Sequence, residues 1–320
     1  MKPSYAVLLD LASFDRGDLD LSPLRSVCGH WDLHQRTARE ETRRRISDAE
    51  VVVSNKVVLD HGLLQSAPGL KLVCIAATGT NNVDLGAARE LGIAVTNVTG
   101  YATPAVVQHV FALMLTHATR LFDYRRAVLA GAWTGSDHFC LLDYPIRELA
   151  GRTLAIVGYG ELGRAVAKAA GAFAMEVLVA QRPGGAAHPD RLPLSRLLPR
   201  VDVLTLHCPL AENTRNLIGS AELALMRPDA LLINTARGGI VDEHALADAL
   251  RNGTIGGAAV DVLTVEPPRA GNPLLDPAIP NLVVTPHTAW ASRECRQRLV
   301  QEVAENIRVF SAGGERNRLV

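Results

Sequence analysis

The amino-acid sequence predicts an α/β protein made of two Rossmann-like domains, each built on a doubly wound parallel sheet. Short, continuous apolar runs alternate with helical segments along the chain, and such runs are typical of strands that are buried on both faces. A glycine-rich turn joins one of these runs to an alanine-rich helix near the middle of the chain. With 320 residues, the chain is long enough for two hydrophobic cores.

The first hundred residues predict a small parallel domain. Strands are expected at residues 6–9, 51–54, 72–76 and 94–96, and the arginine-rich segment between the first two is expected to be a solvated helix. A turn rich in Gly, Thr and Asn follows the third strand, at the sheet edge where such folds bind ligands. Its N–H groups could hold a carboxylate, or it is a plain turn in which Asn82 or Asp84 caps the next helix.

A long helix is expected from Thr103 to about Ala130, and because apolar residues lie nearly all round it we expect it to be buried. The segment that follows, residues 131–151, is irregular and contains exposed aromatic residues. Loops of this length are unusual inside one domain, so residues 100–150 are expected to form a dimerisation helix and arm. The alternative is that the arm packs on its own chain. The aromatic residues are Trp133, Phe139 and Tyr144.

The segment 151–182 predicts a dinucleotide site. Gly158, Gly160 and Gly163 have the G-x-G-x-x-G spacing between a strand at 154–157 and a helix, and a second strand follows at 177–180. The first glycine allows the tight turn, the second allows a pyrophosphate to approach, and the third allows close packing of helix and strand. The N-terminus of the helix offers free N–H groups to the phosphates.

The end of the second strand bears on which dinucleotide binds. An acidic residue there would favour NAD, but the chain has Gln181 and Arg182. Gln181 cannot repel a 2′-phosphate and Arg182 can pair with one, which favours NADP(H). If Arg182 is only a solvated surface residue, the protein uses either cofactor.

Polar residues recur just after the later strands, which are expected at 203–206, 231–234, 257–260 and 282–285. Arg237 could bind a substrate carboxylate or carbonyl, or it could be a structural residue paired with Asp242 or Glu243. His287 can donate a proton at neutral pH, and Glu266 would stabilise its charged form. We expect these groups to lie together beside the dinucleotide. The last helix is expected at 292–310.

These motifs resemble those of the D-isomer-specific 2-hydroxyacid dehydrogenases over nearly the full length of the chain. The matching segments are 158–163, 207–210, 233–242, 261–267 and 285–290. Within the family, segments 55–59 and 77–84 and Trp290 resemble the glycerate dehydrogenases, also called hydroxypyruvate reductases. Relatives often have an acid where Gln181 stands.

The resemblance implies a role for each of these residues. Arg237 would bind the carboxylate and carbonyl oxygen of a 2-keto acid, His287 would protonate that oxygen, and Glu266 would keep His287 protonated. The substrate would be bound by Asn55, Lys56, Thr78, Gly79 and Trp290. The cofactor would be bound by Thr103, Gly158, Tyr159, Gly160, Glu161, Leu162, Gly163, Gln181, Arg182, His207, Cys208, Pro209, Thr214, Thr235, Ala236, Arg237, Asp261, His287 and Ala289.

The resemblance also implies a substrate-binding domain made of residues 1–99 and 290–320, a dinucleotide-binding domain at 100–289, and a cleft between them. The expected activity is NAD(P)H-dependent reduction of hydroxypyruvate and glyoxylate to D-glycerate and glycolate, and the reverse. One alternative is a dehydrogenase of another 2-hydroxy acid, or of formate or phosphite. A second is a dinucleotide-sensing binding protein, since corepressors with this fold exist.

The composition of the chain argues against several other classes of protein. The formal net charge is zero and aromatic residues make up 4%, so neither a nucleic-acid nor a membrane partner is indicated. The five cysteines include no C-x-x-C pair, so neither a metal site nor a disulfide framework is predicted. Because the apolar run near the N-terminus is too short for a signal peptide or a membrane span, the expected location is the cytoplasm.

Overall fold

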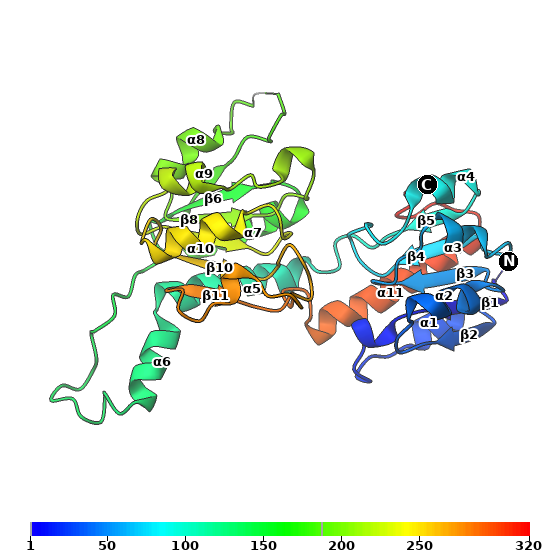
Figure 1. The fold of residues 1–320 in the computed structure, drawn as a ribbon, viewed down its shortest axis with the longest axis horizontal. Helices are drawn as coiled ribbons and strands as arrows, with labels where there is room; N and C mark the ends of the chain where they lie inside the picture. The colour runs from blue at the N-terminus through cyan, green and yellow to red at the C-terminus, as the bar shows by residue number, and fades with distance from the viewer. Residues whose placement is uncertain (1, 187) are drawn as a thin grey trace. The chain divides into compact units, whose positions relative to one another are not determined.

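The computed structural model describes residues 2–186 and 188–320. The chain divides into two compact units (Figure 1). Unit 1 consists of Met1–Ala102 with Trp290–Val320, and unit 2 is Thr103–Ala289, so the chain passes between them twice. Each unit has its own cluster of buried apolar side chains. The first crossing lies a few residues beyond the boundary expected at 99–100.

Unit 1 contains a five-stranded parallel sheet with the order β2-β1-β3-β4-β5. This is the flavodoxin-like doubly wound order. The strands are β1 (Tyr5–Leu8), β2 (His30–Leu33), β3 (Val51–Ser54), β4 (Leu72–Ile75) and β5 (Ala94–Thr96). The helices are η1 (Leu11–Ser13), α1 (Ser22–Val27), α2 (Arg39–Ile46), α3 (His61–Gln65), α4 (Leu85–Glu90) and α11 (Arg293–Ser311). The last helix comes from the far end of the chain and packs against α1 and β4.

Unit 2 contains a six-stranded parallel sheet with the order β11-β10-β9-β8-β6-β7. The strand order reverses between β6 and β8, which is where such sheets bind ligands. The strands are β6 (Thr153–Val157), β7 (Glu176–Val179), β8 (Val203–Leu206), β9 (Leu231–Asn234), β10 (Gly257–Val260) and β11 (Leu282–Val284). The helices are α5 (Thr103–Ala118), α6 (Leu121–Leu129), α7 (Glu161–Ala172), α8 (Leu194–Leu197), η2 (Leu198–Arg200), η3 (Glu212–Thr214), α9 (Ser220–Leu225), α10 (Glu243–Arg251) and η4 (Pro273–Leu275).

The prediction of two parallel α/β domains is confirmed, and every strand expected from an apolar run is present within a residue of its predicted ends. Three local predictions are wrong. The helix expected at 103–130 is buried only in its first part, because α6 has no buried residue. The segment expected to be only a helix also contains strand β2. This strand is hard to recognise in the sequence because it has only four residues, in which polar and apolar side chains are mixed, and it is partly exposed at a sheet edge. The helix expected from Thr103 to about Ala130 is broken at Arg120, whose φ of 55° is incompatible with a continuous α-helix.

The segment between α6 and β6 is irregular and runs beside α6 as an extended loop (Figure 1). Phe139 is 91% exposed and Leu142 is 83% exposed within the single chain. The Tyr124 hydroxyl, on α6, donates a hydrogen bond to the carbonyl oxygen of Tyr144, which ties this loop to the helix. Among the described residues, no helix is both long and apolar enough to cross a bilayer.

Candidate active site

The glycine turn of unit 2 has the local geometry that the sequence predicts. Gly158 has a φ of 93°, and a Cβ on it would lie 2.5 Å from the carbonyl carbon of His207. A Cβ on Gly163 would lie 2.1 Å from the carbonyl oxygen of Gly158 and 3.2 Å from Ile156 on β6. Only glycine therefore allows the turn, strand β6 and helix α7 to approach this closely.

Gly160 differs from the other two, because a Cβ there would meet no heavy atom within 4 Å. It is the residue before α7, so the first N–H groups of a twelve-residue helix face this open space. Two further polar atoms at the same sheet edge are buried without a partner among the described residues, namely Nδ1 of His207 and Oγ1 of Thr235. Open space, helix N–H groups and unsatisfied polar atoms all fit a dinucleotide.

His207 is electrically neutral at physiological pH, because burial lowers its pKa to about 4. Its Nε2 lies 3.0 Å from the hydroxyl of Thr205, and its main-chain N–H bonds to Val157 on β6. The neighbouring Cys208 is also buried, which raises the pKa of its thiol. The pair therefore lines the predicted cofactor edge without adding charge.

Other predicted cofactor residues have their polar groups engaged within unit 2. The Thr103 hydroxyl donates to Glu161 at 2.6 Å, which connects the starts of α5 and α7. The Thr214 hydroxyl donates to the carbonyl oxygen of Pro209 and accepts from Ala211. Thr214 thus stabilises the turn after β8 through its side chain. Tyr159 and Leu162 are partly exposed within the glycine turn.

The end of β7 carries Gln181 and Arg182. The Gln181 side-chain amide donates to the carbonyl oxygen of Gly185 at 3.2 Å, which folds the following loop back on the strand. Arg182 is exposed, and none of the described acidic side chains pairs with it. This edge thus presents an unpaired cation where many dinucleotide sites have a carboxylate.

His287 and Glu266 form a close pair. Nδ1 of His287 lies 2.6 Å from Oε2 of Glu266, and the other carboxylate oxygen accepts the N–H of Leu263 at 2.8 Å. Each side chain is about one-third exposed, at 31% and 33%. Because the carboxylate binds Nδ1, the second ring nitrogen of His287 is the one available to a substrate.

Arg237 follows β9 and is held by its own turn. The buried side-chain amide of Asn234 donates to the carbonyl oxygen of Arg237 and accepts the N–H of Ala236. Neither acid weighed as a structural partner pairs with the guanidinium: Asp242 caps α10, and Glu243 accepts from Thr264 and Asn272. No other described acid does so. One guanidinium nitrogen donates to the carbonyl oxygen of Ala236 at 2.6 Å, and the charge of Arg237 remains available to an anion.

Sequence reasoning missed several residues that hold His287 in place. His287 has a φ of 54°, a left-handed conformation that costs a non-glycine residue about 1–2 kcal/mol. Asp261, 1% exposed, accepts hydrogen bonds from the Thr285 hydroxyl at 2.5 Å and from the N–H groups of Thr288 and Ala289 at 2.9 Å. We call residues 285–289 the His287 turn. The predicted cofactor residue Asp261 is therefore also its anchor.

The predicted substrate residues Thr78 and Gly79 lie in unit 1, directly after β4. The carbonyl oxygen of Thr78 accepts the side-chain amide of Asn97, and its hydroxyl donates to Val98. Among the described residues, the N–H groups of Thr78, Gly79 and Thr80 have no acceptor. Three adjacent N–H groups suit a carboxylate. The capping alternative also holds in part, because Asp84 caps α4.

Asn55 and Lys56, also in unit 1, follow β3. Both of their N–H groups donate to the buried carboxylate of Asp10, at 2.9 and 2.7 Å. Burial raises the pKa of Asp10, and these backbone hydrogen bonds oppose the rise. The side-chain amide of Asn55 donates to Ser13. Asp10 was not predicted, although an acid that ends an apolar strand is a signal for such a role. Trp290 is partly exposed at the start of the second segment of unit 1.

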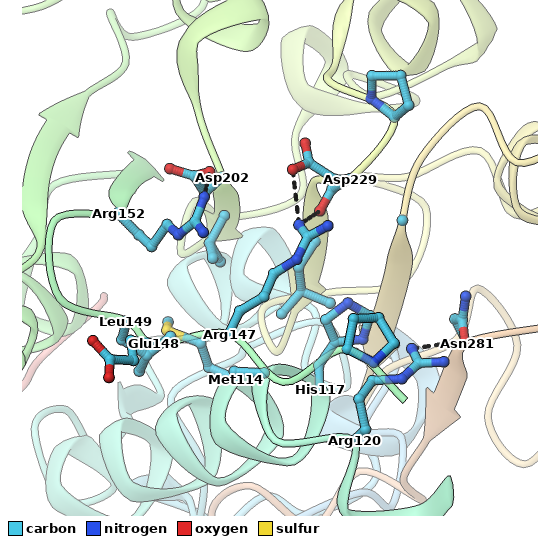
Figure 2. A pocket seen from close by; sticks show the side chains of 16 residues that line it. Met114, His117, Arg120, Arg147, Glu148, Leu149, Arg152, Asp202, Asp229 and Asn281 are labelled. Atoms are coloured by element: carbon cyan, nitrogen blue, oxygen red, sulfur yellow. Dashed lines mark hydrogen bonds and ion pairs between the residues drawn. The ribbon is translucent and has the colours of Figure 1, made fainter. Parts of the chain in front are cut away.

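A cavity of about 260 Å³ in unit 2 lies at the opposite edge of the sheet, beside the amino ends of the strands. Four of its charged side chains form two ion pairs: Arg147 with Asp229, and Arg152 with Asp202 (Figure 2). Arg120 points to Asn281 across the same cavity. The cavity contains none of the predicted site residues.

Comparison with known proteins identifies the class. The family model described as "D-isomer specific 2-hydroxyacid dehydrogenase, NAD binding domain" matches residues 111–289. Glycerate dehydrogenase of Methylorubrum extorquens is 46% identical over 281 residues, which cover 87% of this chain and 88% of the relative. Hydroxypyruvate reductase of Blautia hydrogenotrophica is 34% identical over 317 residues, covering 97% and 98%. The solved structure of the TT0316 protein from Thermus thermophilus has a TM-score of 0.84 and 34% identity, covering 99% of this chain and 100% of that one.

The fold, the glycine turn and the matched NAD-binding domain define an oxidoreductase that uses a nicotinamide dinucleotide. The chain belongs to the D-isomer-specific 2-hydroxyacid dehydrogenase family.

Proposed function

We propose that the protein reduces hydroxypyruvate and glyoxylate to D-glycerate and glycolate, and catalyses the reverse reactions. The observation that carries the proposal is the His287–Glu266 pair, with a nitrogen-to-oxygen distance of 2.6 Å. Relatives named glycerate dehydrogenase and hydroxypyruvate reductase support the choice of substrate.

In the proposed reaction His287 is the general acid and base. The bound reduced cofactor supplies the hydride. His287 gives its proton to the carbonyl oxygen of the keto acid, and the Glu266 carboxylate stabilises the imidazolium before the transfer. Arg237 binds the substrate's carboxylate and carbonyl oxygen, in keeping with its lack of a described acidic partner. The reverse reaction needs the neutral imidazole, so the two directions have opposite pH preferences.

Residues of unit 1 also bind the substrate in this proposal. The N–H groups of Thr78 and Gly79 bind its carboxylate, and Asn55, Lys56 and Trp290 are further substrate-binding residues. Among the cofactor residues, Thr214 acts through its main chain in this proposal, because its hydroxyl is already engaged, whereas His207 and Thr235 offer side-chain atoms without a described partner.

We propose that NADP(H) is preferred over NAD(H). Arg182 is exposed and has no described acidic partner, so it can pair with a 2′-phosphate, and Gln181 does not repel one. We also propose a homodimer formed by residues 100–150, whose exposed apolar side chains would be covered by a second copy. The cytoplasm remains the predicted location.

Initial rates with hydroxypyruvate and glyoxylate, each with NADPH and with NADH, test the function. We expect fast turnover and a preference for NADPH. His287→Ala and Arg237→Ala should abolish most turnover while cofactor binding survives. Full turnover by either variant would refute the site assignment. No turnover of either substrate would direct the search to other 2-keto acids, and then to a dinucleotide-sensing protein.

A further inference from the structure

His109, on α5, lies against the His287 turn. Its Nε2 is 3.1 Å from the hydroxyl oxygen of Thr285 and 3.6 Å from Oδ1 of Asp261, and its side chain is 20% exposed. Neither the sequence motifs nor the reaction described above gives it a role. These contacts connect α5, a helix distant in sequence, to the residues that surround His287.

The direction of each hydrogen bond follows from the chemistry of the groups. The Thr285 hydroxyl has one proton and donates it to the Asp261 carboxylate at 2.5 Å. It can therefore only accept from His109, whose Nε2 must carry a hydrogen. His109 thus fixes the rotation of the Thr285 hydroxyl. The hydroxyl in turn donates a hydrogen bond to the carboxylate of Asp261, which is only 1% exposed and needs such partners.

Asp261 passes this constraint to the main chain on both sides of His287. Its carboxylate accepts the N–H groups of Thr288 and Ala289, and its carbonyl oxygen accepts the N–H of His287 at 2.8 Å. A left-handed non-glycine residue persists only where its surroundings over-determine it. The network supplies that constraint and so sets the direction in which the imidazole points.

We propose that His109 is a positioning residue for the reaction: through Thr285 and Asp261 it holds the His287 turn in the conformation that places the imidazole against Glu266. The inference rests on the proposed function, because it assigns His287 as the proton donor. His109 does not itself touch the substrate in this arrangement. The competing explanation is that His109 only fills space beside the turn.

Two matched pairs of variants separate these explanations. His109→Phe keeps a ring but removes the donor, whereas His109→Gln keeps an N–H. Thr285→Val keeps the shape but removes the hydroxyl, whereas Thr285→Ser keeps it. We expect the Phe and Val variants to lower kcat by about 10- to 100-fold, the range expected for a small misplacement of a catalytic group. The Gln and Ser variants should recover most of the rate, and KM should change little in all four.

The double variant His109→Phe with Thr285→Val should be no slower than the slower single variant, because both changes break one chain of hydrogen bonds. Losses that multiply, or a Gln variant as slow as the Phe variant, would overturn the proposal. His244→Phe, at an exposed position on α10, is the control for the loss of a histidine.

A second readout does not depend on turnover. The short hydrogen bond between His287 and Glu266 should give a strongly downfield ring N–H proton signal, identified by its loss in Glu266→Gln. That signal should shift or broaden in His109→Phe and Thr285→Val and persist in His109→Gln. If no keto acid is reduced but the signal behaves in this way, the proposed function fails and the positioning role stands. An unchanged signal in His109→Phe would refute the positioning role alone.

Discussion

Gly160→Ala should weaken cofactor binding without unfolding the protein. The backbone at Gly160 has a negative φ of −80° and a ψ of −154°, close to the extended region that alanine adopts, and the added methyl group would meet no protein atom within 4 Å. The structural losses are a small adjustment of ψ and a poorer N-cap for α7, which costs less than about 1 kcal/mol. The methyl group would instead occupy the space in which we expect the pyrophosphate to lie.

The size of the effect follows from that overlap. Forcing an extra methyl group into a close contact costs about 1–3 kcal/mol. Because about 1.4 kcal/mol corresponds to a tenfold change in affinity, the Kd for NADPH should rise about 5- to 150-fold. The melting temperature of the free protein should fall only slightly, but the added stabilisation by NADPH at a fixed concentration should shrink.

Calorimetric titration with NADPH, together with thermal unfolding, measures both quantities. Gly163→Ala is the contrasting variant, because its Cβ would lie 2.1 Å from the carbonyl oxygen of Gly158 and the backbone must move. We expect that variant to lose stability even in the absence of cofactor. If Gly160→Ala binds NADPH as tightly as the parent protein does, the glycine turn does not seat the pyrophosphate.

Three further results are expected. Arg182→Ala should raise the KM for NADPH about tenfold or more and leave the KM for NADH unchanged, because a hydrogen bond to a charged group contributes about 1.5–3 kcal/mol. Equal effects on both cofactors would exclude a contact between Arg182 and a 2′-phosphate. Burial lowers the pKa of His117 and of His207 from 6.5 to about 4, so the unfolded chain binds more protons between these values. The free energy of unfolding should therefore fall as the pH is lowered through that window, by up to about 1.4 kcal/mol per pH unit for each histidine. Urea titrations at several pH values measure this free energy, and it should depend less steeply on pH in His117→Gln. Light scattering should find a dimer that becomes a monomer when Phe139 and Leu142 are both changed to Asp; a parent protein that is already a monomer would contradict the proposed interface.

The parallel strands could be predicted because burial on both faces requires continuous apolar runs, and β3 and β8 are such runs. The residues proposed for catalysis could also be picked out from the sequence, since Arg237, Glu266 and His287 each follow a strand or its turn. The edge strand β2 was missed because it has only four residues, and an alternation of polar and apolar side chains that short does not stand out beside the charged segment that follows it. The break at Arg120 was missed because nothing in the apolar pattern of the helix marks a left-handed residue.

The residues that support the site were harder to predict than those proposed to react. Each supporting residue holds a turn through hydrogen bonds. Asn234 bonds within its own turn, whereas Asp10 and His109 bond to segments far away in the sequence. A lone Asn, Asp or His has no characteristic spacing. Their roles depend on which atoms meet in three dimensions, and the linear sequence does not contain that information.

The double crossing between the units also affects how the chain folds during synthesis. Unit 2 is one continuous segment, whereas unit 1 lacks α11 until residues 290–320 have left the ribosome. Buried Leu299, Val303 and Ile307 on α11 are part of the interior of unit 1. At about 5–20 residues per second, the first five strands wait for roughly 10–40 s with an incomplete core. The nascent protein should therefore need protection by a chaperone over that interval, although its dinucleotide unit can fold first.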